Sequence, residues 1–159
     1  FNSGGPLRGF KRALYEGGIR VPGIARWPGT IQAGATSDQP WAFWDILPTL
    51  CDIASAQPPK DIDGISFAPA LLAKDGAAPE QRQHDFFYWE FHEQGSKQAL
   101  RMGNWKAVRL KQGQPLELYD LATDIGETKN VAREHPDTIA EIEAYLANAR
   151  TPNEHWPLK

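Results

Sequence analysis

The sequence predicts an α/β chain in two parts. The first part is expected to hold a glycine-rich loop, a strand and an amphipathic helix, and the second a four-stranded antiparallel sheet packed on one helix. Three observations indicate this: apolar segments separated by glycine-containing turns in residues 86–120, an amphipathic pattern after Pro136, and a polar, linker-like stretch at residues 73–83. We expect the first part to cover residues 1–75 and the second to cover residues 76–159.

The first part begins with a loop, because residues 1–18 are rich in glycine and show little periodicity. Ile19–Trp27 is rich in β-branched and apolar residues and predicts a strand, in which Pro22 marks an edge, a bulge or the strand's first residues. Asp45–Ala54 predicts a helix that Asp45 can cap and that buries one apolar face. A short second helix is expected near Phe67–Leu72.

The second part predicts a meander of four antiparallel strands at residues 86–91, 98–102, 105–110 and 116–120. Pro136 suits the first position of a final helix. The apolar residues of this helix recur on one side, so we expect it to cover one face of the sheet; they are Ile139, Ile142, Leu146 and Ala149.

Composition excludes several partners. The chain has 159 residues, with 17 Lys and Arg against 20 Asp and Glu, and no basic block, which argues against nucleic acid or an anionic membrane surface. No apolar stretch approaches the roughly 20 residues of a membrane-spanning helix. The single cysteine, Cys51, excludes an internal disulfide, and its place on an apolar helix face favours a small buried side chain over a catalytic thiolate.

Several common chemistries lack their residues. Gly4–Arg12 contains glycines and a lysine but not the adjacent Gly-Lys-Ser/Thr of a phosphate-binding loop. The four histidines do not occur at helical metal-ligand spacing with a glutamate between them, which argues against a zinc hydrolase. Gly4–Gly18 places Arg8, Lys11 and Arg12 among glycines, a composition that suits either an anion site or a solvated cationic loop.

Leu7–Pro22, followed by Arg26–Gly29, resembles the second signature of the type I, formylglycine-dependent sulfatases of the alkaline phosphatase superfamily. The resemblance continues with the spacing of the carboxy-terminal third of bacterial arylsulfatase-like enzymes, through Asp45–Leu50, Asp63–Ser66, Tyr88–Phe91, Arg101–Lys106, Glu117–Leu121 and Asp124–Thr128. It implies that residues 1–75 end a large α/β catalytic domain and that residues 76–159 form its carboxy-terminal subdomain.

The resemblance further implies that the parent protein hydrolyses aryl or carbohydrate sulfate esters with Ca²⁺ and a formylglycine. The Cys/Ser-x-Pro-x-Arg motif that yields formylglycine is not in this chain, which opens at Phe1 without an initiator methionine or a signal segment. We therefore expect a fragment that is inactive alone and binds neither cofactor. The family suggests a periplasmic or extracellular location.

The resemblance also implies roles for single residues. In this family the lysine preceding the Tyr-Glu-Gly-Gly element contacts the sulfate oxygens, which makes Lys11 a catalytic and substrate-binding residue here. An ammonium group suits an equatorial sulfate oxygen and can stabilise charge that develops on the leaving oxygen. Arg8 is either a second substrate contact or a structural partner of Glu16.

His92 is a further candidate substrate-binding residue. Strand alternation places Tyr88, Glu90 and His92 on one face, which either borders the substrate cleft or is an ordinary sheet surface. Trp105 is a core residue or, less in keeping with its setting, a platform for stacking a sugar.

Two other functions remain open, and partners can be stated only by class. The chain is also compatible with a phosphonate- or phosphodiester-cleaving hydrolase of the same superfamily, and with a non-catalytic module for assembly or carbohydrate binding. The expected partner is a sulfated small molecule or glycan. Because the predicted strand and helix of the first part would lack a sheet to pack against, we also expect self-association.

Overall fold

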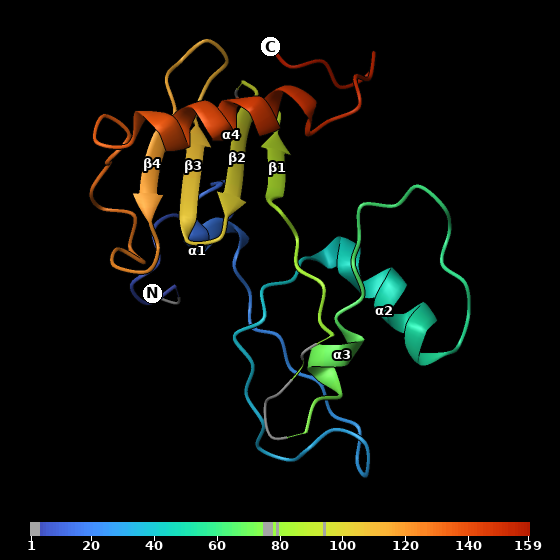
Figure 1. Cartoon of the computed structure of the whole chain (residues 1–159). Helices are drawn as coiled ribbons and strands as arrows, with labels where there is room; N and C mark the ends of the chain where they lie inside the picture. Colours follow the sequence, from blue (N-terminus) through green and yellow to red (C-terminus); the bar gives the residue numbers. More distant parts are fainter. Residues whose placement is uncertain (1–3, 75–77, 79, 94) are drawn as a thin grey trace. The chain divides into compact units, whose positions relative to one another are not determined.

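The computed structural model describes residues 4–74, 78, 80–93 and 95–159 (Figure 1). It divides into two compact units, one formed by Phe1–Val21 with Asp85–Lys159 and the other by Pro22–His84. The division differs from the two consecutive segments expected from the sequence, because the first 21 residues join the carboxy-terminal unit. Within the described residues, no helix combines the length and apolar character needed to cross a membrane.

The carboxy-terminal unit contains the predicted meander. Its strands run antiparallel in the order β1 (Phe87–Phe91), β2 (Lys97–Met102), β3 (Trp105–Arg109) and β4 (Glu117–Asp120). Met102 is paired with Trp105, so Gly103 and Asn104 form a two-residue turn. The four expected strands are confirmed, with ends shifted by one residue.

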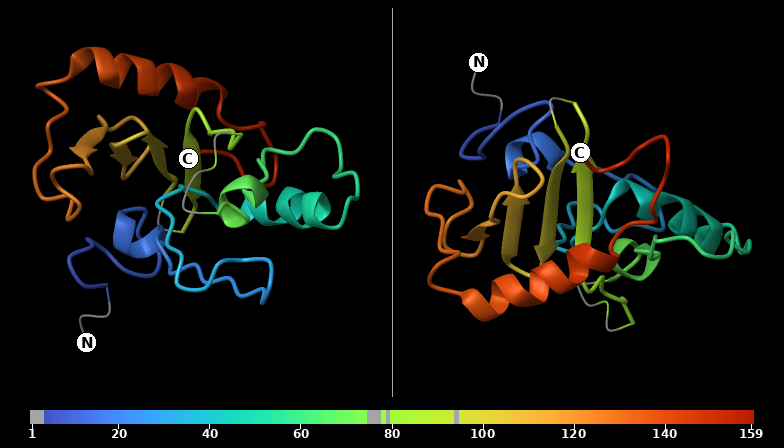
Figure 2. Two further views of the ribbon diagram at one scale, coloured as in Figure 1. Left: turned by 60° about the horizontal axis from the view of Figure 1, so that its bottom comes forward. Right: turned by 90° about the horizontal axis from the view of Figure 1, so that it is seen from above.

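One face of the sheet is covered by α4 (Pro136–Asn148), as Figure 2 shows. The buried residues Ile142 and Leu146 of α4 pack against side chains of the sheet, and the core of this layer also includes Leu100, Ala107, Leu116 and Leu118. Pro136 occupies the start of the helix. The expected helix and the face it buries are confirmed.

The opposite face is covered by a segment that includes Leu14, Tyr15 and the short helix α1 (Glu16–Ile19) (Figure 2). The buried core on this side consists of Leu14, Tyr15, Ala99, Val108 and Tyr119. This second layer was not expected from the sequence. It places the glycine-rich loop directly on the sheet.

The unit of residues 22–84 contains η1 (Phe43–Asp45), α2 (Ile46–Ile53) and α3 (Ala68–Leu71). These elements confirm the two expected helices. The prediction that Asp45 caps α2 was wrong. Its carboxylate instead accepts from the main-chain N–H groups of Ala42 and Ile65 at 2.8 Å each. His84 Nε2 lies 2.8 Å from the same carboxylate.

The prediction of a strand at Ile19–Trp27 was wrong. Ile19 ends α1, and residues 20–27 are irregular and pair with no strand in the described part of the chain. A strand requires a neighbour for its main-chain hydrogen bonds, and Pro22 has no N–H to donate. The Ile24 side chain is 94% exposed, so the apolar pattern of this segment is not matched by burial.

Candidate functional site

The Lys11 loop, residues 8–18, is closed by its own main chain. Gly17 N–H donates to the Arg8 carbonyl at 2.7 Å, and Ala13 N–H donates to the Phe10 carbonyl at 2.8 Å. Gly17 and Gly18 lie in α1, where the lack of a side chain permits close approach of the main chain. A Cβ atom on Gly18 would lie 2.1 Å from the Ala13 carbonyl oxygen, so no side chain fits there.

Lys11 lies exposed in a turn of this loop. Among the described residues no hydrogen bond or ion pair engages its ammonium group, whereas the neighbouring cations are paired. Arg12 lies 3.0 Å from Glu93, and Arg20 lies 3.8 Å from Glu16. Lys11 is therefore the cation of this loop that remains available for an external anion.

The Arg8 side chain anchors the beginning of the loop. Its Nη1 donates to the Tyr119 hydroxyl at 2.8 Å and to the Glu127 carbonyl at 2.9 Å, and its guanidinium lies 3.9 Å above the centre of the Tyr15 ring. The pairing of Arg8 with Glu16 considered above is not what the structure shows. Arg8 instead binds residues of β4 and of the turn that follows it.

Tyr15 anchors the middle of the loop to the same strand. Its hydroxyl donates to Glu117 Oε2 at 2.5 Å, and the Tyr119 hydroxyl donates to the same oxygen at 2.8 Å. Burial, reinforced by the Glu117 carboxylate, raises the pKa of Tyr119 to about 12 and also raises the pKa of Tyr15. Both hydroxyls therefore remain donors at neutral pH.

Glu16 anchors the end of the loop through a buried charge cluster, defined as Glu16, Lys106 and Glu127. Lys106 Nζ donates to Glu16 Oε1 at 3.0 Å and lies 3.9 Å from Glu127 Oε1. The Glu16 N–H donates to Glu127 Oε2 at 2.7 Å. The three side chains are at most 2% exposed, so the sheet holds the loop through charges shielded from water.

Burial dominates the electrostatics of this cluster. It raises the pKa of Glu127 to about 7, against the opposing effects of the Glu16 N–H and of Lys106, and it lowers the pKa of Lys106. Glu127 Oε1 is buried without a hydrogen-bond partner among the described residues. Lys106 thus lies near two buried carboxylates, and the negative charge of Glu127 is the less well neutralised of the two.

The turn after β4 sets the position of Glu127. Asp124 Oδ2 accepts from the N–H groups of Thr128 and Lys129 at 2.7 and 2.8 Å, and the Glu127 N–H donates to the Asp124 carbonyl at 3.1 Å. Glu127 itself has a φ of 51°, a left-handed conformation that costs a non-glycine residue roughly 1 kcal/mol or more. The turn holds Glu127 in this conformation.

His92 lies in a different network, on the face of the sheet that α4 covers. Its Nε2 is 3.1 Å from Glu90 Oε1, its Nδ1 is hydrogen-bonded to Ser96 Oγ at 3.2 Å, and its ring lies 5.8 Å from that of Trp156. Glu90 in turn binds Arg150 at 2.8 Å. The structure does not join His92 to the network of the Lys11 loop.

Sequence reasoning missed the buried charge cluster. Trp105 packs with the α4 layer and its ring lies 4.7 Å from that of His135, in keeping with a core residue. Lys106, next in the chain, therefore faces the opposite layer, where the Lys11 loop lies. The available signal was a lysine in an apolar strand beside a tryptophan, which implies a buried partner of opposite charge.

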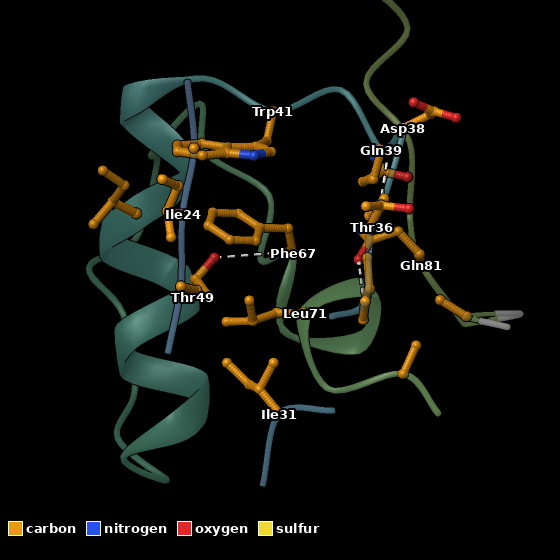
Figure 3. A pocket seen from close by; sticks show the side chains of 18 of the residues that line it. Ile24, Ile31, Thr36, Asp38, Gln39, Trp41, Thr49, Phe67, Leu71 and Gln81 are labelled. Carbon is orange, nitrogen blue, oxygen red and sulfur yellow. Dashed lines mark hydrogen bonds between the residues drawn. The ribbon is translucent and has the colours of Figure 1, made fainter. Parts of the chain in front are cut away.

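The unit of residues 22–84 contains an apolar pocket of about 950 Å³ (Figure 3). The rings of Trp41 and Phe67 stack at 4.6 Å along its wall, with Ile24, Ile31 and Leu71 nearby. None of the predicted site residues lines it. The charged side chain in its lining is Asp38, whose negative charge does not suit a sulfate.

The described residues contain no group of three or more His, Cys, Asp or Glu side chains that could hold a metal ion. Cys51 is a free, half-buried thiol in α2. The residues described here therefore do not fit the Ca²⁺ site or the formylglycine that the family resemblance implies.

Comparisons with known proteins identify the family. The family described as N-sulphoglucosamine sulphohydrolase, C-terminal, matches residues 9–151. A sulfatase of Schizosaccharomyces pombe is 36% identical over 149 residues, which cover 88% of this chain and 26% of that protein. Human arylsulfatase A is 35% identical over 150 residues, which cover 80% of this chain and 29% of that protein.

Solved structures agree in fold. The protein Ps i-CgsB, in complex with k-i-k-neocarrahexaose, superposes with a TM-score of 0.74 and 28% identity, covering 97% of this chain and 34% of that one. The expected sulfatase-like, alkaline phosphatase-like fold is thereby confirmed. The chain spans about a third or less of the length of these relatives. It belongs to the N-sulphoglucosamine sulphohydrolase C-terminal family of the sulfatases.

Proposed function

We propose that this chain is the carboxy-terminal segment of an enzyme that hydrolyses sulfate esters, and that Lys11 contacts the sulfate group. The observation that carries the proposal is the contrast within the Lys11 loop. Arg8, Tyr15 and Glu16 are each bound to the sheet or to the turn after β4, while the Lys11 ammonium is exposed and unpaired among the described residues. A fixed loop that leaves one cation free is suited to binding an anion.

The chemistry fits a tetrahedral, singly charged ester. A lysine ammonium is a compact charge with three donors, and it can bind a sulfate oxygen in the ground state and the more negative oxygens of the transition state. Such a contact is typically worth about 3 kcal/mol where water is excluded. In the proposed enzyme, the rest of the catalytic domain would provide that exclusion.

The remaining catalytic groups lie outside this segment in the proposal. Because the described residues do not fit a metal site, Ca²⁺ and formylglycine would be held by other parts of the enzyme. The isolated chain is then inactive, and its contribution is Lys11 with one wall of the substrate cleft. An enzyme acting on an aryl or carbohydrate sulfate is in keeping with the relatives, among them an arylsulfatase and a protein bound to k-i-k-neocarrahexaose. Its location is proposed to be periplasmic or extracellular.

Arg8 and His92 have weaker support as substrate contacts. Arg8 uses its guanidinium to bind Tyr119 and Glu127, and His92 is bound to Glu90 and Ser96. We therefore assign the sulfate contact to Lys11 alone. Substitution of His92 by Asn would test for any additional role in substrate binding.

The test is steady-state kinetics of the complete enzyme with Lys11→Met, which keeps the length of the side chain and removes its charge. We expect kcat/KM for 4-nitrophenyl sulfate to fall by about 100-fold or more. Lys111→Met is the matched control, because Lys111 is also an exposed lysine in a turn. Unchanged turnover by Lys11→Met would overturn the proposal, and preferential cleavage of a phosphonate monoester by the unmodified enzyme would replace the substrate class.

A further inference from the structure

Glu127 contacts both ends of the Lys11 loop. Its carbonyl oxygen accepts from Arg8 Nη1 at 2.9 Å at the beginning of the loop, and its carboxylate Oε2 accepts from the Glu16 N–H at 2.7 Å near the end. The loop closes on itself beside these contacts, through the hydrogen bond from Gly17 N–H to the Arg8 carbonyl. A single residue of the turn after β4 therefore connects the beginning of the Lys11 loop to its end.

We propose that Glu127 is a positioning residue for Lys11, and that Lys106 keeps its carboxylate in place. The inference rests on the proposed function of Lys11 and adds to it a residue that does not touch the substrate. Glu127 is fully buried and cannot reach a ligand, so it acts through the loop. Its effect on catalysis would be to restrict where the Lys11 ammonium lies.

The arrangement is costly for the fold, which points to a positional role. Glu127 combines a left-handed φ of 51° with a fully buried carboxylate whose Oε1 has no hydrogen-bond partner among the described residues. A buried, incompletely satisfied carboxylate in a strained conformation costs stability. Strain of this kind is concentrated where a defined geometry is needed for function.

Lys106 offsets part of this cost. Its Nζ binds Glu16 at 3.0 Å and lies 3.9 Å from Glu127, while Arg101 and Arg20 approach the other oxygen of Glu16 at 3.7 and 3.8 Å. The surrounding cations thus favour Glu16, while the Glu127 carboxylate has Lys106 at longer range and the charge of Arg8. Within the cluster, Glu127 is consequently the residue that mainly holds the loop, by accepting the hydrogen bond from the Glu16 N–H.

Two substitutions separate the acceptor from the charge. Glu127→Gln retains an oxygen that can accept from the Glu16 N–H, whereas Glu127→Leu removes the acceptor at similar volume. A misplacement of about 1 Å at a catalytic group can cost roughly 100-fold in rate. We therefore expect Glu127→Leu to lower kcat of the complete enzyme by about 10- to 100-fold, and Glu127→Gln by less than about 3-fold.

The deciding experiment places Glu127→Leu in both the Lys11 and the Lys11→Met background and measures kcat and KM for 4-nitrophenyl sulfate. If Glu127 acts through Lys11, its substitution causes a large loss in the first background and less than about 3-fold further loss in the second. Equal losses in both backgrounds, or full activity of Glu127→Leu, would overturn the positioning role. Full activity of Lys11→Met would instead overturn the proposed function itself.

A second measurement does not depend on the folding of a variant. The amide of Glu16 should exchange its hydrogen slowly in the unmodified protein, at a rate set by global unfolding, because it is buried against Glu127. Exchange at the rate of an exposed loop would contradict a stable hydrogen bond between the Glu16 N–H and the Glu127 carboxylate. Glu127→Gln should keep this protection.

Discussion

The main-chain N–H of Glu16 donates to the carboxylate of Glu127 at 2.7 Å, across 111 positions of the sequence. This hydrogen bond joins the Tyr-Glu-Gly-Gly element to the turn after β4. Together with the anchoring of Arg8 and Tyr15 on the residues of β4, it explains how a glycine-rich loop can hold a defined shape. The carboxy-terminal sheet is thus a foundation for the residue proposed to bind sulfate.

Replacing the Glu127 carboxylate should change how stability depends on pH. Burial raises its pKa from an ordinary 4.5 to about 7, with Lys106, Glu16 and Arg8 as the charged groups that act on it. Between these values the folded state binds more protons than the unfolded state, so the free energy of unfolding falls as pH rises from about 4.5 to about 7. Between pH 5 and pH 8 the decrease in the free energy of unfolding should be about 2 kcal/mol, and Glu127→Gln should not show it.

Urea unfolding of the two proteins at pH 5 and pH 8 measures this difference. The unmodified protein should lose stability relative to Glu127→Gln as the pH is raised. An identical pH dependence in both proteins would show that the Glu127 carboxylate titrates as an exposed one.

Removing the Lys106 charge should destabilise the fold strongly. Lys106→Met leaves the carboxylates of Glu16 and Glu127 buried without their lysine, and loss of one partner of a buried ion pair typically costs about 3–5 kcal/mol. Lys111→Met, at an exposed position, should change the free energy of unfolding by less than about 0.5 kcal/mol. Denaturant titration measures the free energy of unfolding of both variants. Equal stabilities would show that the Lys106 charge does not stabilise the two buried carboxylates.

The close approach at Gly18 should not tolerate a methyl group. Gly18→Ala would place a Cβ atom 2.1 Å from the Ala13 carbonyl, so the loop must shift, at a cost of about 1–3 kcal/mol. Gly4→Ala is the control, because its Cβ would meet only the Leu7 carbonyl at 3.6 Å. Thermal unfolding of both variants measures the difference, and a Gly18→Ala protein as stable as Gly4→Ala would contradict the tight loop.

The chain studied alone should self-associate. In the unit of residues 22–84, Ile24, Phe43 and Leu50 are 94%, 70% and 58% exposed, which leaves apolar surface in contact with water. Light scattering should show a mass that rises with concentration, and the double substitution Phe43→Ser and Leu50→Ser should reduce the association. A monomer at all concentrations that also binds no apolar dye would refute this expectation.

The sequence predicted the elements whose signals are local. Apolar segments separated by glycine-containing turns indicate the four strands, and the spacing of Ile142 and Leu146 indicates the buried face of α4. Lys11 was singled out from its place in a motif, and its contact with sulfate stays a prediction. These features depend on residues close together in the chain.

The remaining features depend on contacts between distant segments. The strand expected at Ile19–Trp27 has no neighbouring strand among the described residues. Its β-branched and apolar composition therefore does not lead to a strand, because no partner is there to accept and donate its main-chain hydrogen bonds. Arg8 binds Tyr119 and Glu127, more than a hundred residues away, where the sequence pointed to Glu16 nearby. The burial of Glu127 follows from the packing of the loop on the sheet, and no periodic pattern marks it.

A crystal structure of the complete protein with bound inorganic sulfate would show whether Lys11 contacts the anion. We expect Lys11 Nζ to lie about 3 Å from an oxygen of the sulfate in the catalytic pocket, with Glu127 still bound to the Glu16 N–H. A sulfate bound in that pocket while the Lys11 side chain points away from it would refute the proposed role of Lys11.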